Sequence, residues 1–255
     1  MSTMLKRDRE IKRRYEEGES TGSIGKDFGM TSRNVRRILN QVGVELKSRG
    51  RPTRYKIDED FFKRWSPDMA YVLGLVITDG TINGNQVVLA QKERQILEKV
   101  VRAMGSDYPV RERSNGEGNI YTLTISRKTI VEDLRKLGVD ERKSLIIRMP
   151  KIPEQYLGHF LRGVIDGDGW VHEKGYTMCV TTGSQTFAEE LEGLFSANGY
   201  RTRATEQQTV NTVAYRAWVS GKGDIKRLGR WLYEDCGELY IPRKRERFEY
   251  HLDVA

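Results

Sequence analysis

Residues 160–169 read F-L-R-G-V-I-D-G-D-G, and residues 71–80 read Y-V-L-G-L-V-I-T-D-G. Both stretches are apolar nearly all round, so each is predicted to form a buried helix that ends in Asp-Gly. Each also carries small residues four positions apart, which allow two helix backbones to approach closely. These small residues are Ala70, Gly74 and Thr78 in one stretch and Gly163 and Gly167 in the other. The sequence therefore predicts a soluble protein in which two near-duplicate helices pack side by side.

Parallel packing of these helices would bring Asp79 and Asp168 together at the helix ends. A helix C-terminus carries partial negative charge, and a second carboxylate adds like-charge repulsion. Two carboxylates held against this repulsion indicate a bound divalent cation, and oxygen ligands with water suit Mg²⁺. Gly80 and Gly169 are expected to take the left-handed conformation that ends many helices. The alternative is a pair of ordinary Asp-Gly turns, which the repetition makes less favourable.

The paired segments resemble the signature helices of the LAGLIDADG homing endonucleases in their single-chain, two-repeat form, across residues 67–250. The resemblance implies an α+β fold in which two pseudo-symmetric αββαββα repeats form a DNA-binding saddle. Asp79 and Asp168 match the metal-binding acids of that family. Ile77 replaces an acidic residue often found two positions earlier, whereas Asp166 keeps it. The implied cofactor is Mg²⁺, with Mn²⁺ or Ca²⁺ as substitutes in vitro.

The resemblance also implies an activity, which is site-specific cleavage of both strands of a long DNA target across the minor groove. Metal-assisted hydrolysis by water would leave short 3′ overhangs. Lys143 and Lys244 occupy matching places in the two repeats and are expected to stabilise developing negative charge. Gln91, at a strand end, is similar to a residue that positions water in relatives, and its counterpart is either Thr182 or Ser184. The alternatives are surface lysines and a helix-capping glutamine. The expected catalytic residues are Asp79, Asp168, Gln91, Lys143 and Lys244.

Alternating apolar and polar residues predict strands with one face on the core and the other toward DNA. In residues 120–126, Tyr121, Leu123 and Ile125 alternate with threonine and serine. Residues 215–219 show the same alternation with arginine and tryptophan. The DNA contacts expected from the strands are Arg111, Arg113, Thr122, Thr124, Arg201, Arg203, Arg216 and Trp218.

The positive charge of the chain lies at its N-terminal end. Residues 1–56 hold 15 Lys+Arg against 7 Asp+Glu, whereas the remaining residues hold 29 of each. A basic segment on a neutral body indicates nucleic acid as a partner, with a solvated basic tail as the alternative. Three short helices with a glycine turn before the third form a helix-turn-helix pattern, similar to that of resolvase-like and phage regulatory proteins. Thr21 or Ser23 is expected to cap the second helix, and Thr31 or Ser32 the third.

The third helix is expected to contact DNA because its outer face carries no acidic residue, although a solvated face is the alternative. Its candidate contacts are Arg33, Asn34, Arg36, Arg37 and Asn40. Residues 47–56 read K-S-R-G-R-P-T-R-Y-K, and Arg49 and Arg51 around the glycine resemble an AT-hook that enters a narrow minor groove. The alternative is a flexible basic linker. The domains expected are a helix-turn-helix over 1–46, this linker over 47–66, and an endonuclease domain over 67–255, with repeats 67–150 and 151–255.

Several classes of protein are disfavoured. No apolar run approaches the ~20 residues of a membrane span, and with three His and two Cys no zinc-ligand spacing is present. We expect no membrane association, a monomer that binds double-stranded DNA, and a cytoplasmic location, with a prokaryotic or phage gene favoured and an organellar one left open. The chain begins Met-Ser-Thr and ends Asp-Val-Ala, so it lacks the terminal residues of a splicing intein and a free-standing protein is expected.

Two further functions remain as alternatives to the nuclease. One is a DNA-binding transcriptional regulator on the same scaffold with catalysis lost, which the presence of both Asp79 and Asp168 makes less favourable. The other is a maturase that binds its host intron RNA, either instead of cleavage or as an additional role.

Overall fold

The computed structural model describes residues 6–46, 54–114, 118–141, 145–208 and 213–250. The chain divides into two compact units, Met1–Arg54 and Tyr55–Ala255. Arg49, Arg51 and Lys143, which the sequence suggested as functional, lie outside the described residues. Within the described ranges, no helix combines the length and the apolar character that crossing a bilayer would require.

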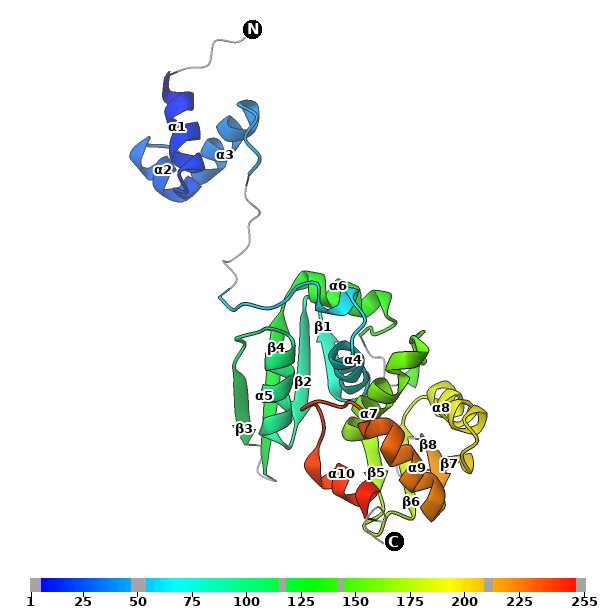
Figure 1. Ribbon diagram of the computed structural model, residues 1–255. Coiled ribbons are helices and arrows are strands. Elements are labelled where there is room, and N and C mark those ends of the chain that lie inside the picture. The colour runs from blue at the N-terminus through cyan, green and yellow to red at the C-terminus, as the bar shows by residue number, and fades with distance from the viewer. Residues whose placement is uncertain (1–5, 47–53, 115–117, 142–144, 209–212, 251–255) are drawn as a thin grey trace. The chain divides into compact units, whose positions relative to one another are not determined.

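The N-terminal unit is a bundle of three helices (Figure 1). They are α1 (Lys6–Glu16), α2 (Thr21–Asp27) and α3 (Ser32–Gln41). Their shared core consists of Ile11, Tyr15, Ile24, Val35, Ile38 and Leu39. Thr31 caps α3 by accepting a hydrogen bond from Asn34 N at 3.3 Å. The cap of α2 differs from both expected residues, because Ser20 accepts the hydrogen bond from Ser23 N at 3.1 Å. The helix begins earlier than the sequence suggested, since Ser20 is already in the extended conformation of a cap.

The second unit contains two copies of one arrangement, each with a four-stranded antiparallel sheet. The first copy follows a short 3-10 helix η1 (Phe61–Lys63), and its strand order is β1-β2-β4-β3. Its elements are α4 (Pro67–Asp79), β1 (Gly80–Asn83), β2 (Gln86–Gln91), α5 (Arg94–Ala103), β3 (Val110–Ser114), β4 (Asn119–Ser126) and α6 (Lys128–Lys136).

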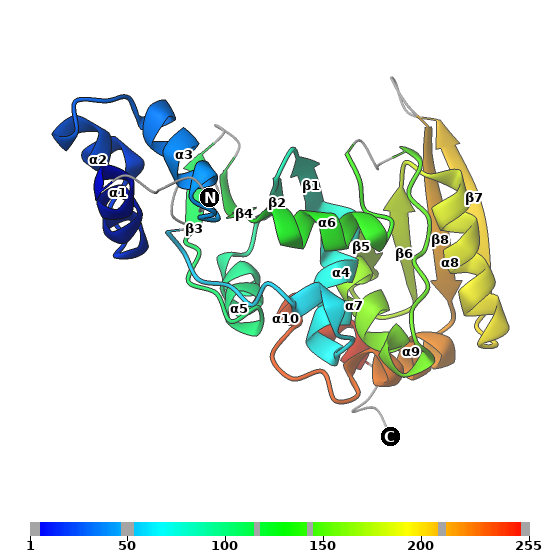
Figure 2. The ribbon, with the colours of Figure 1, turned by 90° about the horizontal axis from the view of Figure 1, so that it is seen from above.

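The second copy follows η3 (Glu154–Tyr156) and has the equivalent strand order β5-β6-β8-β7. Its elements are α7 (Leu157–Asp168), β5 (Gly169–Val171), β6 (Thr177–Thr182), α8 (Gln185–Ala197), β7 (Thr202–Gln208), β8 (Val213–Ser220) and α9 (Lys222–Tyr233), and α10 (Pro242–Glu249) comes last. The predicted α+β fold of two αββαββα repeats is therefore confirmed. The helices α4 and α7 pack together between the two sheets, with β1 and β5 beside them (Figure 2).

Glycine allows α4 and α7 to touch through their backbones. A Cβ atom added to Gly74 would lie 2.3 Å from Phe160 O, and one added to Gly163 would lie 2.1 Å from Tyr71 O. Real Cβ atoms do not come this close to backbone oxygens, so any larger side chain would push the helices apart. The small residues of the two signature helices thus form the contact that the sequence predicted.

The glycines that end these helices act differently from the prediction. Gly80 has φ −88° and ψ 145°, and Gly169 has φ −83° and ψ 141°, so both are extended and neither is left-handed. A Cβ on Gly80 would lie 2.4 Å from Val76 O, and one on Gly169 would lie 2.4 Å from Ile165 O. The chain passes directly from helix into strand here. Glycine is required because a Cβ atom would collide with the preceding helix, and not because of the backbone conformation.

Candidate functional site

The two predicted acids lie at adjacent helix ends. Asp79 is the last residue of α4 and Asp168 is the last residue of α7. A Cβ on Gly167, next to Asp168 in the chain, would lie 2.8 Å from Asp79 Oδ2 and 1.9 Å from Thr78 Oγ1. Asp168 is exposed, whereas Asp79 is half-buried. The packing of α4 on α7 therefore brings both carboxylates to one place, in different environments.

Gln91 contacts the first of these acids. Its Nε2 donates a hydrogen bond to Asp79 Oδ2 at 2.5 Å, so the amide orients this carboxylate. The strand register identifies the equivalent position in the second repeat, because Gly80 pairs with Leu89 and Gly169 pairs with Val180. Two residues after Val180 comes Thr182, which therefore takes the place of Gln91.

Ser184, the other candidate for that position, has a structural role. Its hydroxyl donates to Ile147 O at 2.7 Å and accepts from Phe187 N at 3.3 Å, which caps α8. Thr182 Oγ1 in turn accepts a hydrogen bond from Ser184 N at 3.2 Å.

A small cavity opens beside Asp168. Its volume is about 50 Å³, and its lining includes Thr78, Asp168, Thr182 and Gly183. This space is large enough for a water molecule. The apolar side chains of Ile77, Ile147 and Phe187 complete the lining, so the hydroxyls of Thr78 and Thr182 and the carboxylate of Asp168 share this space with apolar groups.

Lys244 lies beneath this site rather than on the surface. Its side chain is buried, and its Nζ donates to Ile165 O at 2.6 Å, Asp166 O at 2.7 Å and Gly167 O at 3.3 Å. These are the carbonyls at the end of α7, so the ammonium neutralises the negative end of that helix. Burial lowers the pKa of Lys244 to about 8, against the opposing effect of Asp166. The sequence predicted that Lys244 would stabilise the negative charge that develops in the reaction, but its ammonium donates instead to these three backbone carbonyls.

Asp166, the acid that Ile77 replaces in the first repeat, is fully buried. Its Oδ2 accepts from Tyr71 OH at 2.9 Å and from Ile241 N at 3.0 Å. Burial raises the pKa of the Asp166 carboxyl to about 6, and the nearby charge of Lys244 opposes this rise. Asp166 therefore joins α7 to α4 and to the segment before α10, and it has no access to a substrate.

The carboxylates fit a divalent cation that takes most of its ligands from elsewhere. Nowhere in the described residues do three or more His, Cys, Asp or Glu side chains gather as a ready metal cluster. Asp79 and Asp168 would therefore supply two hard oxygen ligands, and water and phosphate oxygens would complete the shell. Mg²⁺ is commonly bound in this manner.

Each sheet has an inner face on the helices and an outer face. The register places Arg111 opposite Thr122 and Arg113 opposite Ile120 on the outer face of the first sheet. Thr124 is on the same face and is half-buried, whereas Thr122 is 6% exposed and donates to Arg111 O at 3.4 Å. Thr122 is thus placed as expected but is covered by its neighbours.

The outer face of the second sheet carries the other expected residues. Arg203 pairs with Trp218, and Arg216 pairs with Thr205. The guanidinium groups of Arg203 and Arg216 lie 5.5 and 5.9 Å from the ring centre of Trp218, whose Nε1 donates to Thr205 Oγ1 at 2.8 Å. Arg201 precedes β7 and is exposed. Trp218 therefore lies against two arginines on the outer face of the second sheet.

Charge separates the outer faces from the rest of this unit. By register, the described strand residues on the two outer faces include no carboxylate, and Glu112 and Glu206 lie on inner faces. The ion pairs among the described residues involve none of the five arginines 111, 113, 201, 203 and 216. Arginines on the helices do form such pairs, for example with neighbouring glutamates in α5 and α10. Two uncompensated basic faces are suited to a polyanion.

The same contrast occurs in the N-terminal unit. On α1, Arg13 pairs with glutamates at 2.6 and 2.7 Å, and Arg14 pairs with Glu19 at 2.6 Å. On α3, Arg33 and Arg37 are exposed and take no part in the ion pairs of the described residues, and Asn34 and Asn40 are exposed beside them. Arg36 is half-buried and its Nε reaches Thr21 Oγ1 at 3.4 Å. The outer face of α3 is therefore an uncompensated basic surface among the described residues of this unit, with Arg36 partly turned toward α2.

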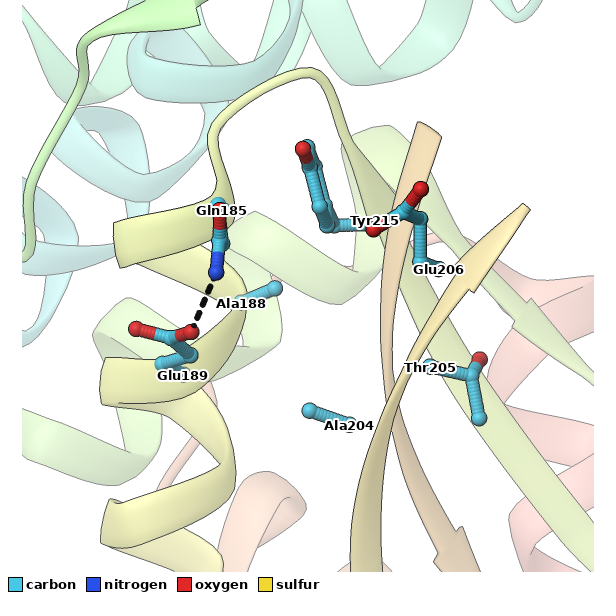
Figure 3. Close-up of a pocket in the computed structure, with 7 residues that line it drawn as sticks. All are labelled: Gln185, Ala188, Glu189, Ala204, Thr205, Glu206 and Tyr215. Atoms are coloured by element: carbon cyan, nitrogen blue, oxygen red, sulfur yellow. Dashed lines mark hydrogen bonds between the residues drawn. The ribbon is translucent and has the colours of Figure 1, made fainter. Parts of the chain in front are cut away.

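A larger groove lies elsewhere, between α8 and the inner face of β7 and β8 (Figure 3). Its volume is about 160 Å³, and Ala188 and Ala204 line it together with Glu189, Glu206 and Tyr215. Its two glutamates and its position away from Asp79 and Asp168 disfavour it as a site for phosphate groups.

The sequence interpretation missed Trp170 and the threonines Thr81, Thr181 and Thr205 on the outer faces. The strand alternation that revealed Arg216 and Trp218 could also have revealed Thr181 and Thr205. Three-residue β5 was too short to show a clear period.

A family profile described as a LAGLIDADG-like domain matches residues 66–138 and 155–230, and one described as a helix-turn-helix domain matches residues 5–54. The crystal structure of I-DmoI with DNA and Ca is 16% identical and covers 76% of this chain and 100% of its own, with a TM-score of 0.50. Full-length WhiA from Thermatoga maritima is 12% identical and covers 78% and 66%, with a TM-score of 0.49. Among curated proteins, the Rpo1C component of DNA-directed RNA polymerase from Methanocaldococcus jannaschii is 22% identical over 71% of this chain and 21% of its own length. This chain thus spans about a fifth of that relative.

Proposed function

This chain belongs to the LAGLIDADG-like domain family, and we propose that it is a site-specific endonuclease that cleaves both strands of duplex DNA with the help of a divalent cation, preferably Mg²⁺. The observation that carries the proposal is the meeting of Asp79 and Asp168 at the ends of α4 and α7. A protein that only binds DNA gains nothing from two carboxylates beside a basic surface, since they repel phosphate. Their presence there favours catalysis over binding alone.

The side chains around the carboxylates have separate parts in this proposal. Asp79 and Asp168 would hold the cation, which would supply stabilisation of the negative charge that develops on the phosphoryl and leaving oxygens. Gln91 fixes the orientation of Asp79, and Thr182 offers a hydroxyl at the equivalent place beside Asp168. Lys244 compensates the negative end of α7, which lowers the cost of holding Asp168 there. Lys244 is accordingly a positioning residue.

The arginine-bearing outer faces would bind the duplex on either side of the carboxylates. Half or more of protein–DNA hydrogen bonds go to phosphates and sugars and fix register, so the arginines would position the DNA. The helix-turn-helix unit would contact additional base pairs through Arg33, Asn34, Arg37 and Asn40, and would lengthen the recognised site. Cleavage across the minor groove with short 3′ overhangs, as in intron homing, is the outcome proposed.

The test is selection and cleavage on a randomised duplex library. The purified full chain is incubated with the library in Mg²⁺ or in EDTA, and the ends of broken molecules are sequenced. We expect Mg²⁺-dependent double-strand breaks at an enriched sequence, and loss of these breaks in both Asp79→Asn and Asp168→Asn. Asp68→Asn, which removes an exposed carboxylate from the opposite end of α4, is the control and should cleave normally.

A DNA-binding regulator is the second candidate, and the uncompensated arginines of α3 favour it as much as they favour the nuclease. The same experiment separates the two functions. A sequence that is enriched by binding in Ca²⁺ but is cut in neither Mg²⁺ nor Mn²⁺ would support the regulator and refute the nuclease.

A further inference from the structure

Trp170 occupies an unusual place in the second unit. It follows Asp168 by two residues and lies in β5, the strand beside α7. Its side chain is 46% exposed. A single exposed apolar residue is common on protein surfaces and alone would indicate nothing. This indole is unusual because it lies beside a proposed cation ligand.

The strand register shows which way Trp170 faces. It pairs with Cys179, which pairs with Trp218, which pairs with Arg203. These four residues form one row across the outer face of the second sheet. Trp170 therefore shares its face with the arginines that are proposed to hold DNA phosphates, and it lies at the end of the row nearest to the carboxylates.

The equivalent position in the first repeat holds a small polar residue. Gly80 and Gly169 begin β1 and β5, so Thr81 corresponds to Trp170. Thr81 is exposed as well. A large side chain is therefore present at only one of the two equivalent strand positions beside the α4–α7 pair. The fold does not require an aromatic residue at this position.

A neighbouring ring contacts the indole without covering it. The ring of His172 meets Trp170 edge-on at 5.9 Å between centroids, and His172 Nδ1 accepts a hydrogen bond from Lys174 N at 3.1 Å. Trp218, by contrast, is covered by Arg203 and Arg216. Trp170 is thus in contact with one neighbouring ring and is otherwise accessible.

We infer that Trp170 is a wedge that inserts into the minor groove between base pairs at the centre of the DNA site. The inference rests on the proposed function, because the carboxylates define that centre. Apolar side chains inserted at a base step unstack it and kink the duplex, and flexible pyrimidine–purine steps kink most easily. Trp170 would therefore make the protein prefer deformable base steps at the centre of the site.

The experiment compares three forms of the full chain, the wild type, Trp170→Ala and Trp170→Phe. Each selects sequences from a randomised duplex library in Ca²⁺, so that binding is read without cleavage. The bend of the enriched wild-type duplex is then measured by energy transfer between dyes on its two ends. Tyr176→Ala, which leaves the indole itself in place, is the control for loss of an exposed ring from the same aromatic group, since Tyr176 is 48% exposed and its ring lies 5.6 Å from that of His172.

Trp170→Ala should lose the base preference at the central positions, keep that of the flanks, bend the duplex less and bind it about tenfold more weakly. Trp170→Phe should retain part of the bend, and Tyr176→Ala should leave the central positions unchanged. An unchanged central preference and bend in Trp170→Ala would overturn the wedge alone. Absence of any enriched sequence with the wild type would overturn the wedge together with the proposed function. Enrichment without cleavage in Mg²⁺ would overturn only the nuclease. In that case the base preference at the central positions, compared between wild type and Trp170→Ala, would still test the wedge.

Discussion

The close contact between α4 and α7 predicts a large loss of stability for Gly163→Ala. The added methyl carbon would lie 2.1 Å from Tyr71 O and 3.0 Å from Leu75 N, both of them backbone atoms. Backbone atoms inside a packed helix pair have no rotamer by which to move away. The helices would have to separate by about 1 Å to restore contact distances, and overpacking of this kind costs about 3 kcal/mol. That is a large part of the 5–15 kcal/mol that holds a typical domain folded.

Gly193→Ala is the matched control for this substitution. Gly193 is an exposed residue inside α8, and no atom lies within 4 Å of its added Cβ. Alanine is preferred over glycine in a helix interior by about 1 kcal/mol, so this variant should be slightly more stable than the wild type. Gly163→Ala gains the same helix preference, so the two variants should differ in free energy of unfolding by the overpacking cost alone, about 3 kcal/mol.

Urea unfolding followed by tryptophan fluorescence measures this difference. All four tryptophans lie in the second unit, so the signal reports the unit that contains both helices. Gly74→Ala provides an internal check, because its methyl carbon would lie 2.3 Å from Phe160 O on the same contact. Once one alanine has separated the helices, the second should cost less, so the double variant should lose less than the sum of the two single losses. Equal midpoints and slopes for Gly163→Ala and Gly193→Ala would refute the close contact.

Three further predictions concern charge and the carboxylates. The pKa of Lys244 falls from 10.5 to about 8 on folding. The free energy of unfolding of the wild type relative to that of Lys244→Met should therefore rise by about 3 kcal/mol between pH 8 and 10.5, as measured by urea unfolding at several pH values. A difference between the two proteins that does not change with pH would contradict this. Replacing Arg33 and Arg37 with alanine should flatten the slope of log affinity against log salt by about 1 for each phosphate that is no longer bound, as measured by titration of duplex at several salt concentrations. Arg13→Ala, whose guanidinium is already paired, should change that slope little, and equal slopes in the two variants would speak against α3 as the DNA-binding face. Gln91→Ala should slow one strand's cleavage about 10- to 100-fold and accumulate nicked duplex in a time course, whereas equal slowing of both strands would exclude a part specific to one carboxylate.

The sequence was sufficient to predict the repeated helices, their contact and the meeting of Asp79 with Asp168. All three follow from local signals, since an apolar helix with small residues four apart has few ways to bury itself. The strand alternation likewise predicted which of Arg216 and Ala217 would face outward. These features depend on the period of the chain and not on its partners.

What the sequence did not show depends on contacts between distant segments. The burial of Lys244 follows from its contact with the end of α7, about 80 residues earlier. Local composition, a run of three basic residues, suggested an exposed position instead. Gly80 similarly looked like a residue that ends a helix in the left-handed conformation, but the chain passes directly into β1 in an extended conformation. Glycine is needed there because a Cβ atom would collide with Val76 O. Both differences arise where a residue meets atoms that no short window of sequence contains.

The polar contact between the signature helices shows why the two repeats are not interchangeable. Tyr71 on α4 donates to Asp166 on α7, and the equivalent positions of the opposite repeats hold Phe160 and Ile77. Neither phenylalanine nor isoleucine can make that hydrogen bond, so the polar pair occurs once and its symmetry-related counterpart is apolar. A pair of identical single-repeat chains could not have this arrangement, since both chains would carry the same residue at each of these two positions. A single chain with two repeats can, and buried polar pairs of this kind favour one alignment of the helices over shifted ones. The same freedom extends to the carboxylates, because Asp79 is held by Gln91 while Asp168 lies beside Thr182 and Trp170. Under the proposed function, each half would therefore present its own surroundings to one strand of an asymmetric DNA site.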